Sequence, residues 1–369
     1  MRRLLLGLLC IVILLESSPV FAQEERSYEG RIDAIETMTC DDESEDCLLI
    51  HLRLDDSYDG NRDIDIEVTP LDFLGGRNPG YSVGDTVIVQ SSTIDGEAIF
   101  FIADIVRKRA LLLLLGFFAV AVVLCGGWAA ARSFIGMALS FAILFLAILP
   151  LILHGFPPIP VSIIGALAIM AVTFLISHGW NVKTQAALAG TTISLLITAI
   201  LALFFSWYAH LSGIDEETAF LLSDFPLLDT RGILLAGIII GTLGVLDDIT
   251  ISQASAVMEL RIANPLLQAK QLYKSALRIG NDHISAAVNT LVLAYAGSSI
   301  PLLLLLSSVP SGESWSLMLN REVLAVEIVR TLVGSIGLLC AVPVTTWCAC
   351  MLAVRQNPDT VAHAGQHHH

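Results

Sequence analysis

Residues 241–255 read GTLGVLDDITISQAS, with two adjacent aspartates, Asp247 and Asp248, inside an apolar stretch of the chain. An ionised carboxylate near the centre of a membrane costs about 2.5–3.5 kcal/mol on insertion scales. Burial and a second carboxylate nearby both favour the neutral form of a carboxyl group. The pair therefore predicts a membrane helix whose aspartates load and unload a proton near neutral pH. The alternative is a hydrogen-bonded aspartate that only holds helices together.

A stripe of small and polar residues follows one face of this helix. Residues three or four positions apart share a face, and the stripe consists of Gly237, Gly241, Gly244, Asp248, Ser252, Ser255 and Glu259. Small residues let a neighbouring helix approach closely, so we expect the glycines to be packing positions and Asp248 to point into the bundle. Asp247 is about 100° away around the helix and is expected to reach a different neighbour or a cavity.

The chain as a whole is that of a polytopic membrane protein. It has 369 residues, of which 55% are apolar and 15% charged, and a mean hydropathy of +0.74. Apolar runs of about 20 residues are long enough to cross a bilayer. They predict a mainly α-helical transmembrane domain at 107–355 with seven crossings, at 110–130, 133–153, 157–178, 184–210, 231–256, 282–306 and 324–353.

Further polar residues lie on the helix after the aspartates, within IGNDHISAAVNTLVLAYAG at 279–297. Asn289 is expected two turns inside the membrane, where it could hydrogen-bond an aspartate. Asp282 and His283 are expected near the inner surface, where a histidine can pass protons. The predicted relay comprises Asp247, Asp248, Asn289, Ser252, Glu259, Asp282 and His283. Sodium is an alternative coupling ion, because carboxylate, Ser and Thr oxygens could coordinate it.

The predicted crossings put most basic residues of the connecting segments on one side, which the positive-inside rule assigns to the cytoplasm. Residues 107–109, which read RKR, fall on the outer side, and we expect them to pair with an acidic domain or with lipid headgroups. Residues 257–281 predict an amphipathic helix on the inner membrane face or against the bundle. Residues 356–369 form a C-terminal tail ending in HHH, which is no metal site.

Residues 1–22 are typical of a signal peptide, with an N-terminal anchor as the alternative; either one would export residues 23–106. Residues 23–106 predict a small all-β domain, possibly an OB-like barrel, from five strand-like runs at 28–36, 47–54, 63–70, 85–90 and 99–107. Residues 23–105 hold 21 acidic and 5 basic side chains. This acidic domain excludes a nucleic-acid partner, because it repels phosphates.

Cys40 and Cys47 flank the acidic sequence DDESED and could form a disulfide in an exported domain. The acidic loop could bind Ca²⁺, but it lacks the spacing of an EF-hand, and a solvated loop is favoured. The sequence has no phosphate-binding loop, zinc-ligand spacing or nucleophile elbow. We therefore predict no enzymatic activity, no cofactor and no metal. An aspartyl protease using Asp248 and Asp282 is disfavoured, because Asp282 lies near the surface.

The segments GTLGVLDDITISQASAVMEL and RIGNDHISAAVNTLVLAYAGSSIPLLLLL closely resemble the YibE/F family of bacterial membrane proteins. The resemblance covers most of residues 28–353 and is strongest over 232–306. It implies a multi-pass protein of the bacterial inner membrane, with residues 23–106 outside the cytoplasm, and a role in transport.

A more distant resemblance is to the RND superfamily, which includes efflux pumps and the SecD/SecF translocation helpers. There an intramembrane aspartate carries protons and an extracytoplasmic domain does the work. The resemblance implies that Asp247 and Asp248 are the proton relay, with Asn289 on the next helix. This chain lacks the intramembrane lysine of efflux pumps and their doubled bundle, so a homodimer or a second membrane subunit is expected.

The function expected from these features is a proton-coupled transporter or exporter of an unknown cargo, embedded in lipid. The alternative is an accessory protein of secretion or envelope assembly, similar to SecD/SecF.

Overall fold

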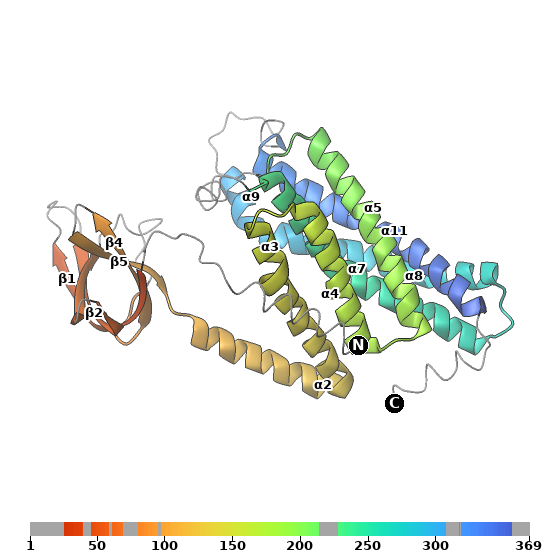
Figure 1. Ribbon diagram of the computed structural model, residues 1–369, viewed down its shortest axis with the longest axis horizontal. Coiled ribbons are helices and arrows are strands. Elements are labelled where there is room, and N and C mark those ends of the chain that lie inside the picture. Colours follow the sequence, from red (N-terminus) through yellow and green to blue (C-terminus); the bar gives the residue numbers. More distant parts are fainter. Residues whose placement is uncertain are drawn as a thin grey trace. The chain divides into compact units, whose positions relative to one another are not determined.

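The computed structural model describes residues 26–39, 46–58, 61–68, 80–94, 97–213, 228–307, 317 and 319–355 (Figure 1). The chain divides into two compact units, one within Glu16–Leu124 and the other containing Cys125–His369. Several predicted features lie outside the described residues. They are the signal or anchor segment 1–22, Cys40, the acidic loop at 41–45 and the tail 356–369.

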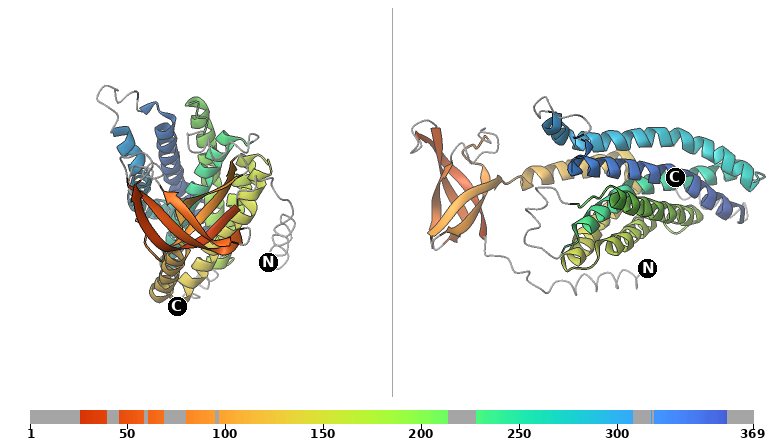
Figure 2. Two further views of the ribbon diagram at one scale, coloured as in Figure 1. Left: turned by 90° about the vertical axis from the view of Figure 1, so that its left-hand side faces the viewer. Right: turned by 90° about the horizontal axis from the view of Figure 1, so that it is seen from above.

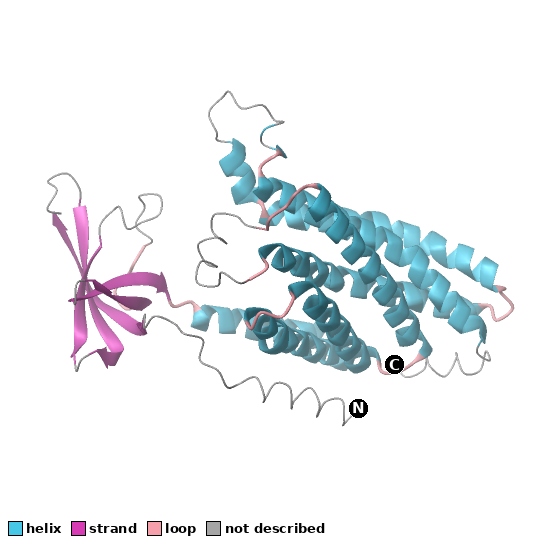
Figure 3. Ribbon diagram, turned by 45° about the horizontal axis from the view of Figure 1, so that its top comes forward, coloured by secondary structure: helices cyan, strands magenta, loops and turns pink. Residues whose placement is uncertain are grey.

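The N-terminal unit is a five-stranded antiparallel sheet, as predicted. Its strands are β1 (Arg26–Thr39), β2 (Asp46–Tyr58), β3 (Asn61–Val68), β4 (Thr86–Ile94) and β5 (Glu97–Ile105). The sheet order is β3-β2-β1-β4-β5. The outermost strands, β3 and β5, also contact each other, so the sheet curls on itself (Figures 2 and 3). This is the small barrel that five short strands predict.

Alternating apolar residues build the core of this barrel, because successive side chains of a strand point to opposite faces. The fully buried members are Ile32, Ile50, Val87 and Val89, with Leu52, Leu54, Ile66 and Val68 almost fully buried. Cys47 is buried at the start of β2 and is disulfide-bonded.

Basic residues after β5 pair with acidic residues of the barrel. Arg107 donates to Asp104 at 2.6 Å, and Lys108 Nζ lies 2.9 Å from a carboxylate oxygen of Glu29. The hydrogen bond from Arg107 holds the pKa of the exposed Asp104 carboxyl below its usual value. Of the two expectations for residues 107–109, pairing with the acidic domain is thus confirmed at Arg107 and Lys108.

The remaining described residues are mostly helical. The elements are α2 (Lys108–Ile143), the π-helix η2 (Leu144–Ile148), α3 (Leu149–Leu153), α4 (Pro158–His178), α5 (Val182–Tyr208), α7 (Thr230–Ala263), α8 (Ala269–Ser298), α9 (Ile300–Ser307) and α11 (Glu322–Arg355). The helical backbone of α2 is interrupted at Gly127, whose φ of 61° favours glycine.

Six helical segments of the described chain are long and apolar enough to cross a membrane. They are Lys108–Trp128, Ala130–Leu153, Pro158–His178, Val182–Tyr208, Thr230–Ala263 and Glu322–Arg355. They correspond to six of the seven predicted crossings. The seventh, 282–306, falls on α8 and α9, and α8 is not among the six because polar residues interrupt its apolar pattern.

The amphipathic segment at 257–281 does not form a helix of its own, which differs from the expectation. Its first part continues α7 to Ala263, and its second part begins α8 after a turn. Its amphipathic character is nevertheless present. Leu272, Ala276 and Gly280 recur every four residues and are buried, whereas Lys274 and Arg278 are exposed. This stretch therefore packs on the bundle, mainly against α11 and α7.

Small and hydroxyl-bearing residues hold the centre of the bundle together. A Cβ atom at Gly190 of α5 would lie 2.9 Å from the Cα of Thr345 on α11, and one at Gly337 of α11 would lie 3.2 Å from the Cβ of Thr198. Such close backbone approach is how membrane helices associate without a hydrophobic driving force. The packing stripe of small residues thus lies between α5 and α11 rather than on the aspartate helix.

Candidate functional site

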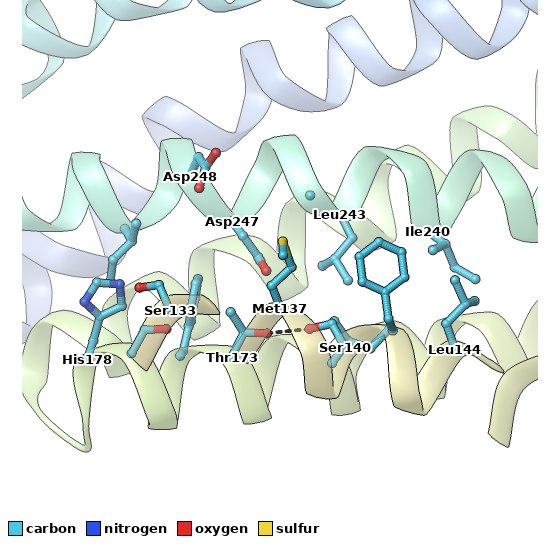
Figure 4. Close-up of a pocket in the computed structure, with 16 residues that line it drawn as sticks. Ser133, Met137, Ser140, Leu144, Thr173, His178, Ile240, Leu243, Asp247 and Asp248 are labelled. Atoms are coloured by element: carbon cyan, nitrogen blue, oxygen red, sulfur yellow. Dashed lines mark hydrogen bonds between the residues drawn. The ribbon is translucent and has the colours of Figure 1, made fainter. Parts of the chain in front are cut away.

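A cavity of about 420 Å³ lies between the second half of α2, α4 and α7 (Figure 4). Its lining residues with polar side chains are Ser133, Ser140, Thr173, Ser177, His178, Asp247 and Asp248. The apolar lining consists of Met137, Phe141, Leu144, Ile169, Phe174, Ile240, Leu243 and Ile251, together with Gly244. The predicted aspartate pair therefore borders the cavity found between these membrane-spanning segments.

Asp247 points into this cavity, towards Met137 and Thr173 (Figure 4). Its Oδ1 atom is buried and has no hydrogen-bond partner among the described residues. A buried polar group without a partner is costly in an apolar environment. The carboxyl group therefore requires a proton, a water molecule or a cation in the cavity. Of the two surroundings expected for Asp247, a different neighbour or a cavity, the structure shows a cavity.

Two threonines fix the backbone of the aspartate pair. Thr250 Oγ1 lies 3.2 Å from the carbonyl oxygen of Asp247 and 2.6 Å from Thr191 Oγ1 on α5. Because Thr250 has one hydroxyl proton to donate, Thr191 is the donor to Thr250 when Thr250 donates to the carbonyl. This buried chain ties the Asp247 turn of α7 to α5.

Asp248 is placed differently from the expectation that it points into the bundle. Its side chain is exposed and lies on the other side of the α7 ribbon from Asp247 (Figure 4). The other members of the predicted stripe are also exposed, except for the half-buried Ser255. A Cβ atom at Gly237 or Gly244 would meet nothing within 4 Å. The stripe is uncovered because α7 uses its larger residues, such as Leu235, Ile239 and Leu246, to pack in the bundle.

The polar residues of α8 are not brought to the cavity. Asn289, Asp282 and His283 are exposed, and no hydrogen bond in the described part of the chain joins Asn289 to an aspartate. Gln253 of α7 donates to the carbonyl of Ala276, and Gly241 of α7 lies beside Tyr295. Helices α7 and α8 therefore run antiparallel beside each other, and Asp248 on α7 and Asn289 on α8 are both exposed.

The hydroxyl groups that face Asp247 were not singled out from the sequence. Ser140 of α2 and Thr173 of α4 are hydrogen-bonded at 2.9 Å, and Ser140 Oγ also donates to the carbonyl of Gly136 at 3.0 Å. With its one proton used there, Ser140 accepts from Thr173. Ser177, one turn further along α4, is buried, and its Oγ has no partner among the described residues. The i, i+4 spacing of Thr173 and Ser177 was the available signal.

His178 completes the polar part of the lining. It is the last residue of α4 and is half-buried, with its ring edge-on to Phe174 at a centroid distance of 6.3 Å. Gly179 ends the helix with a φ of 70°. No role for His178 was predicted from the sequence, since a histidine in a short turn carries no specific signal.

This arrangement can hold a proton or a monovalent cation. One carboxylate and several hydroxyl oxygens supply hard oxygen ligands but little negative charge. No group of three His, Cys, Asp or Glu side chains suited to a metal ion occurs among the residues that the structure describes.

Comparison with known proteins identifies one family. The family model described as YibE/F-like protein matches residues 114–355, about two thirds of the chain, and leaves the β-barrel outside the match. No curated protein and no solved structure matches the chain.

Proposed function

Since this chain belongs to the YibE/F-like family of membrane proteins, we propose that it is a transporter or exporter driven by protons. Asp247 is the proton carrier, in a bundle that crosses the bacterial inner membrane. The acidic barrel lies outside the cytoplasm, where it meets the cargo or a partner protein. The proposal assigns the chain to transport rather than to catalysis.

The observation that carries this proposal is the buried carboxylate oxygen of Asp247, which has no hydrogen-bond partner among the described residues and lies in a cavity between three membrane helices. Ionisable groups inside a membrane are costly, and they usually mark proton relays or ion pathways. A structural role would favour an aspartate whose oxygens are hydrogen-bonded to neighbouring helices. Asp247 instead leaves one oxygen open to the cavity, which suits a group that gains and loses a proton.

We further propose that a second copy of this chain covers the exposed face of α7 and α8. Asp248 on α7 and Asn289 on α8 are both exposed, and neither side chain is stable against lipid alone. The carboxylate accepts hydrogen bonds and the amide donates them, so the face is complementary to a second copy of itself, as a two-fold interface requires. The exposed glycines Gly237 and Gly244 would let the two copies approach closely.

Cysteine cross-linking tests this pairing. The exposed native Cys125 is first replaced by serine to remove its background. In this protein Gly237→Cys, which is exposed and not part of the cavity lining, is expected to form a disulfide-linked dimer on oxidation. Ile200→Cys, on an exposed position of α5, is expected to stay monomeric, and a Gly237→Cys protein that remains monomeric at every oxidant concentration would refute the two-copy arrangement.

Complementation of a strain that lacks the protein tests transport. Ions, metabolites and proteins are measured in cells and medium for the parent, Asp247→Asn and Glu259→Gln. Glu259 was expected in the relay, but it is exposed and does not line the cavity, so this carboxylate on the same helix is the matched control. We expect a small molecule or ion to be redistributed in the deletion strain and restored by the parent and Glu259→Gln only.

Other outcomes would overturn parts of the proposal. If only secreted or envelope proteins change, the chain is an accessory of secretion instead. If Asp247→Asn restores the strain fully, Asp247 is not the carrier.

A further inference from the structure

Most polar residues of the lining gather towards one end of the cavity. Ser133 and His178 lie there, whereas Leu144, Ile240 and Leu243 lie towards the other end, with Asp247 between them (Figure 4). Ser177 directly precedes His178 on α4, and Ile251, one turn after Asp247 on α7, is the apolar residue towards this polar end. Water enters a passage lined by polar groups and is excluded from a narrow apolar one. The separation therefore gives the two ends of the cavity different access to water.

Asp247 lies close to the polar end of the cavity along the direction of α4. Asp247 points towards Thr173, which is five residues before His178 on α4 (Figure 4). Because a helix rises about 1.5 Å per residue, Thr173 and His178 are about 7.5 Å apart along the axis of α4. Ser177 lies between them, and its buried hydroxyl oxygen has no hydrogen-bond partner in the described part of the chain. One or two water molecules bound to Ser177 and the Asp247 carboxyl would satisfy both unpartnered atoms.

We propose that the cavity is a one-sided water passage, open at the end of α4 beside His178 and closed towards Ile240 and Leu144. Through it, Asp247 exchanges its proton with one side of the membrane only. The inference rests on the proposed function, because it assigns the entry route of the proton that Asp247 carries. In the predicted orientation, the open end faces the cytoplasm.

His178 is the residue at the mouth of this passage. An imidazole takes up and releases protons near neutral pH, and its place at the last turn of α4 puts it between the passage and the exterior of the bundle. The titratable groups that line the passage are His178, Asp247 and Asp248. Arg132 on α2, next to Ser133, and Lys183 on α5 are the basic residues close to them in the sequence.

Accessibility of introduced cysteines to a membrane-impermeant thiol reagent tests the passage without knowledge of the cargo. Ser177→Cys is expected to react, and Ile240→Cys is expected not to react from either side. The parent protein gives the background from native cysteines, including the exposed Cys125.

Two loop positions report the side from which the reagent acts. Trp180→Cys, exposed after α4, and Phe156→Cys, exposed before α4, mark the two ends of that helix. Labelling is compared in right-side-out and inverted vesicles. Ser177→Cys is expected to react in the vesicle orientation in which Trp180→Cys reacts, and not in that of Phe156→Cys. Adding His178→Trp is expected to abolish labelling of Ser177→Cys and to leave Trp180→Cys labelled.

The possible results separate the inference from the proposed function. An unreactive Ser177→Cys beside a reactive Trp180→Cys would mean that the cavity is dry, and a reactive Ile240→Cys would mean that it is not one-sided. Either result overturns the passage. Labelling as expected, together with full complementation by Asp247→Asn, would retain the passage and refute proton-coupled transport.

Discussion

Replacing Gly190 by alanine is predicted to destabilise the contact between α5 and α11. A methyl group at this position would lie 2.1 Å from the Oγ1, 2.8 Å from the Cβ and 2.9 Å from the Cα of Thr345. The hydroxyl can rotate away, but the Cα belongs to the backbone of α11. Carbon atoms pack at about 3.5–4.0 Å, so the contact at 2.8 Å with the Cβ of Thr345, which is fixed to the backbone, requires the helices to separate by about 0.7 Å.

The size of the effect depends on two opposing terms. Overpacking a well-packed interior costs about 1–3 kcal/mol, whereas alanine in place of glycine within a helix stabilises by about 0.5–1 kcal/mol. The expected net loss is about 1–2 kcal/mol in the free energy of unfolding. Changing Thr345 to alanine as well is not expected to restore stability fully, because the Cβ and Cα atoms of residue 345 remain.

The assay is unfolding of the detergent-solubilised protein, followed by loss of the folded peak in size-exclusion chromatography. Gly116→Ala is the control, since a Cβ atom there would meet nothing within 4 Å. It should be as stable as the parent or slightly more stable. If Gly190→Ala unfolds under the same conditions as the parent, α5 and α11 do not pack as closely at this position as the structure indicates.

Three further substitutions test other contacts. Gln253→Leu removes two buried interhelical hydrogen bonds and should lower stability by about 1–2 kcal/mol in the unfolding assay, whereas the exposed neighbour Ser252→Ala should not. Glu322→Ala removes the acceptor of three hydrogen bonds from the loop after α5 and should cost about 1–3 kcal/mol; unchanged unfolding would contradict this. Arg107→Gln should raise the pKa of Asp104, measured by NMR titration of its carboxyl signal, because the charge-assisted hydrogen bond from the guanidinium is lost and a neutral amide cannot replace its charge.

The pKa of Asp104 also affects how the stability of the barrel depends on pH. A carboxyl whose pKa is lowered in the folded state stabilises that state above its unfolded pKa, and the contribution is lost as the pH falls through the lowered value. The free energy of unfolding of the barrel should therefore fall less in Arg107→Gln than in the parent, as the pH is lowered from the unfolded pKa of Asp104 to its folded-state pKa. An Asp104 titration that does not change in the variant would refute the assignment.

Much of the architecture could be predicted because it depends on periodicity and apolar length. The five strands and six of the crossings could be predicted from local patterns of apolar and polar residues, without knowledge of contacts between distant parts of the chain. The end of α7 and the start of α8 were harder, because a Leu-rich amphipathic pattern at 257–281 does not reveal where the chain turns. A capping box at Gln268 and Gln271 marks the start of α8, and glutamine at both positions is a weak signal.

The site could be predicted only in part. The helical angle between Asp247 and Asp248 indicated that they face different surroundings. It left open whether Asp247 reaches a neighbouring helix or a cavity, and the expectation that Asp248 points into the bundle was wrong. These placements depend on which face of α7 meets α4 and α2, a contact between residues over 70 positions apart in the sequence. The hydroxyls of Ser140, Thr173 and Ser177 were missed for the same reason, since serine and threonine are common in membrane helices.

The central claim is that Asp247 gains and loses a proton within the membrane. It is tested most directly by infrared spectroscopy of the protein in lipid, in which a protonated carboxyl group has its own carbonyl stretch. The other Asp and Glu side chains, of which the chain has 35 in all with Asp247, also give such a band in acid, so the signal is the difference between the spectra of the parent and of Asp247→Asn at each pH. That difference should contain a carboxyl band that disappears as the medium is made alkaline, and Asp248→Asn should retain this band. No such difference between the parent and Asp247→Asn at any pH would contradict the account.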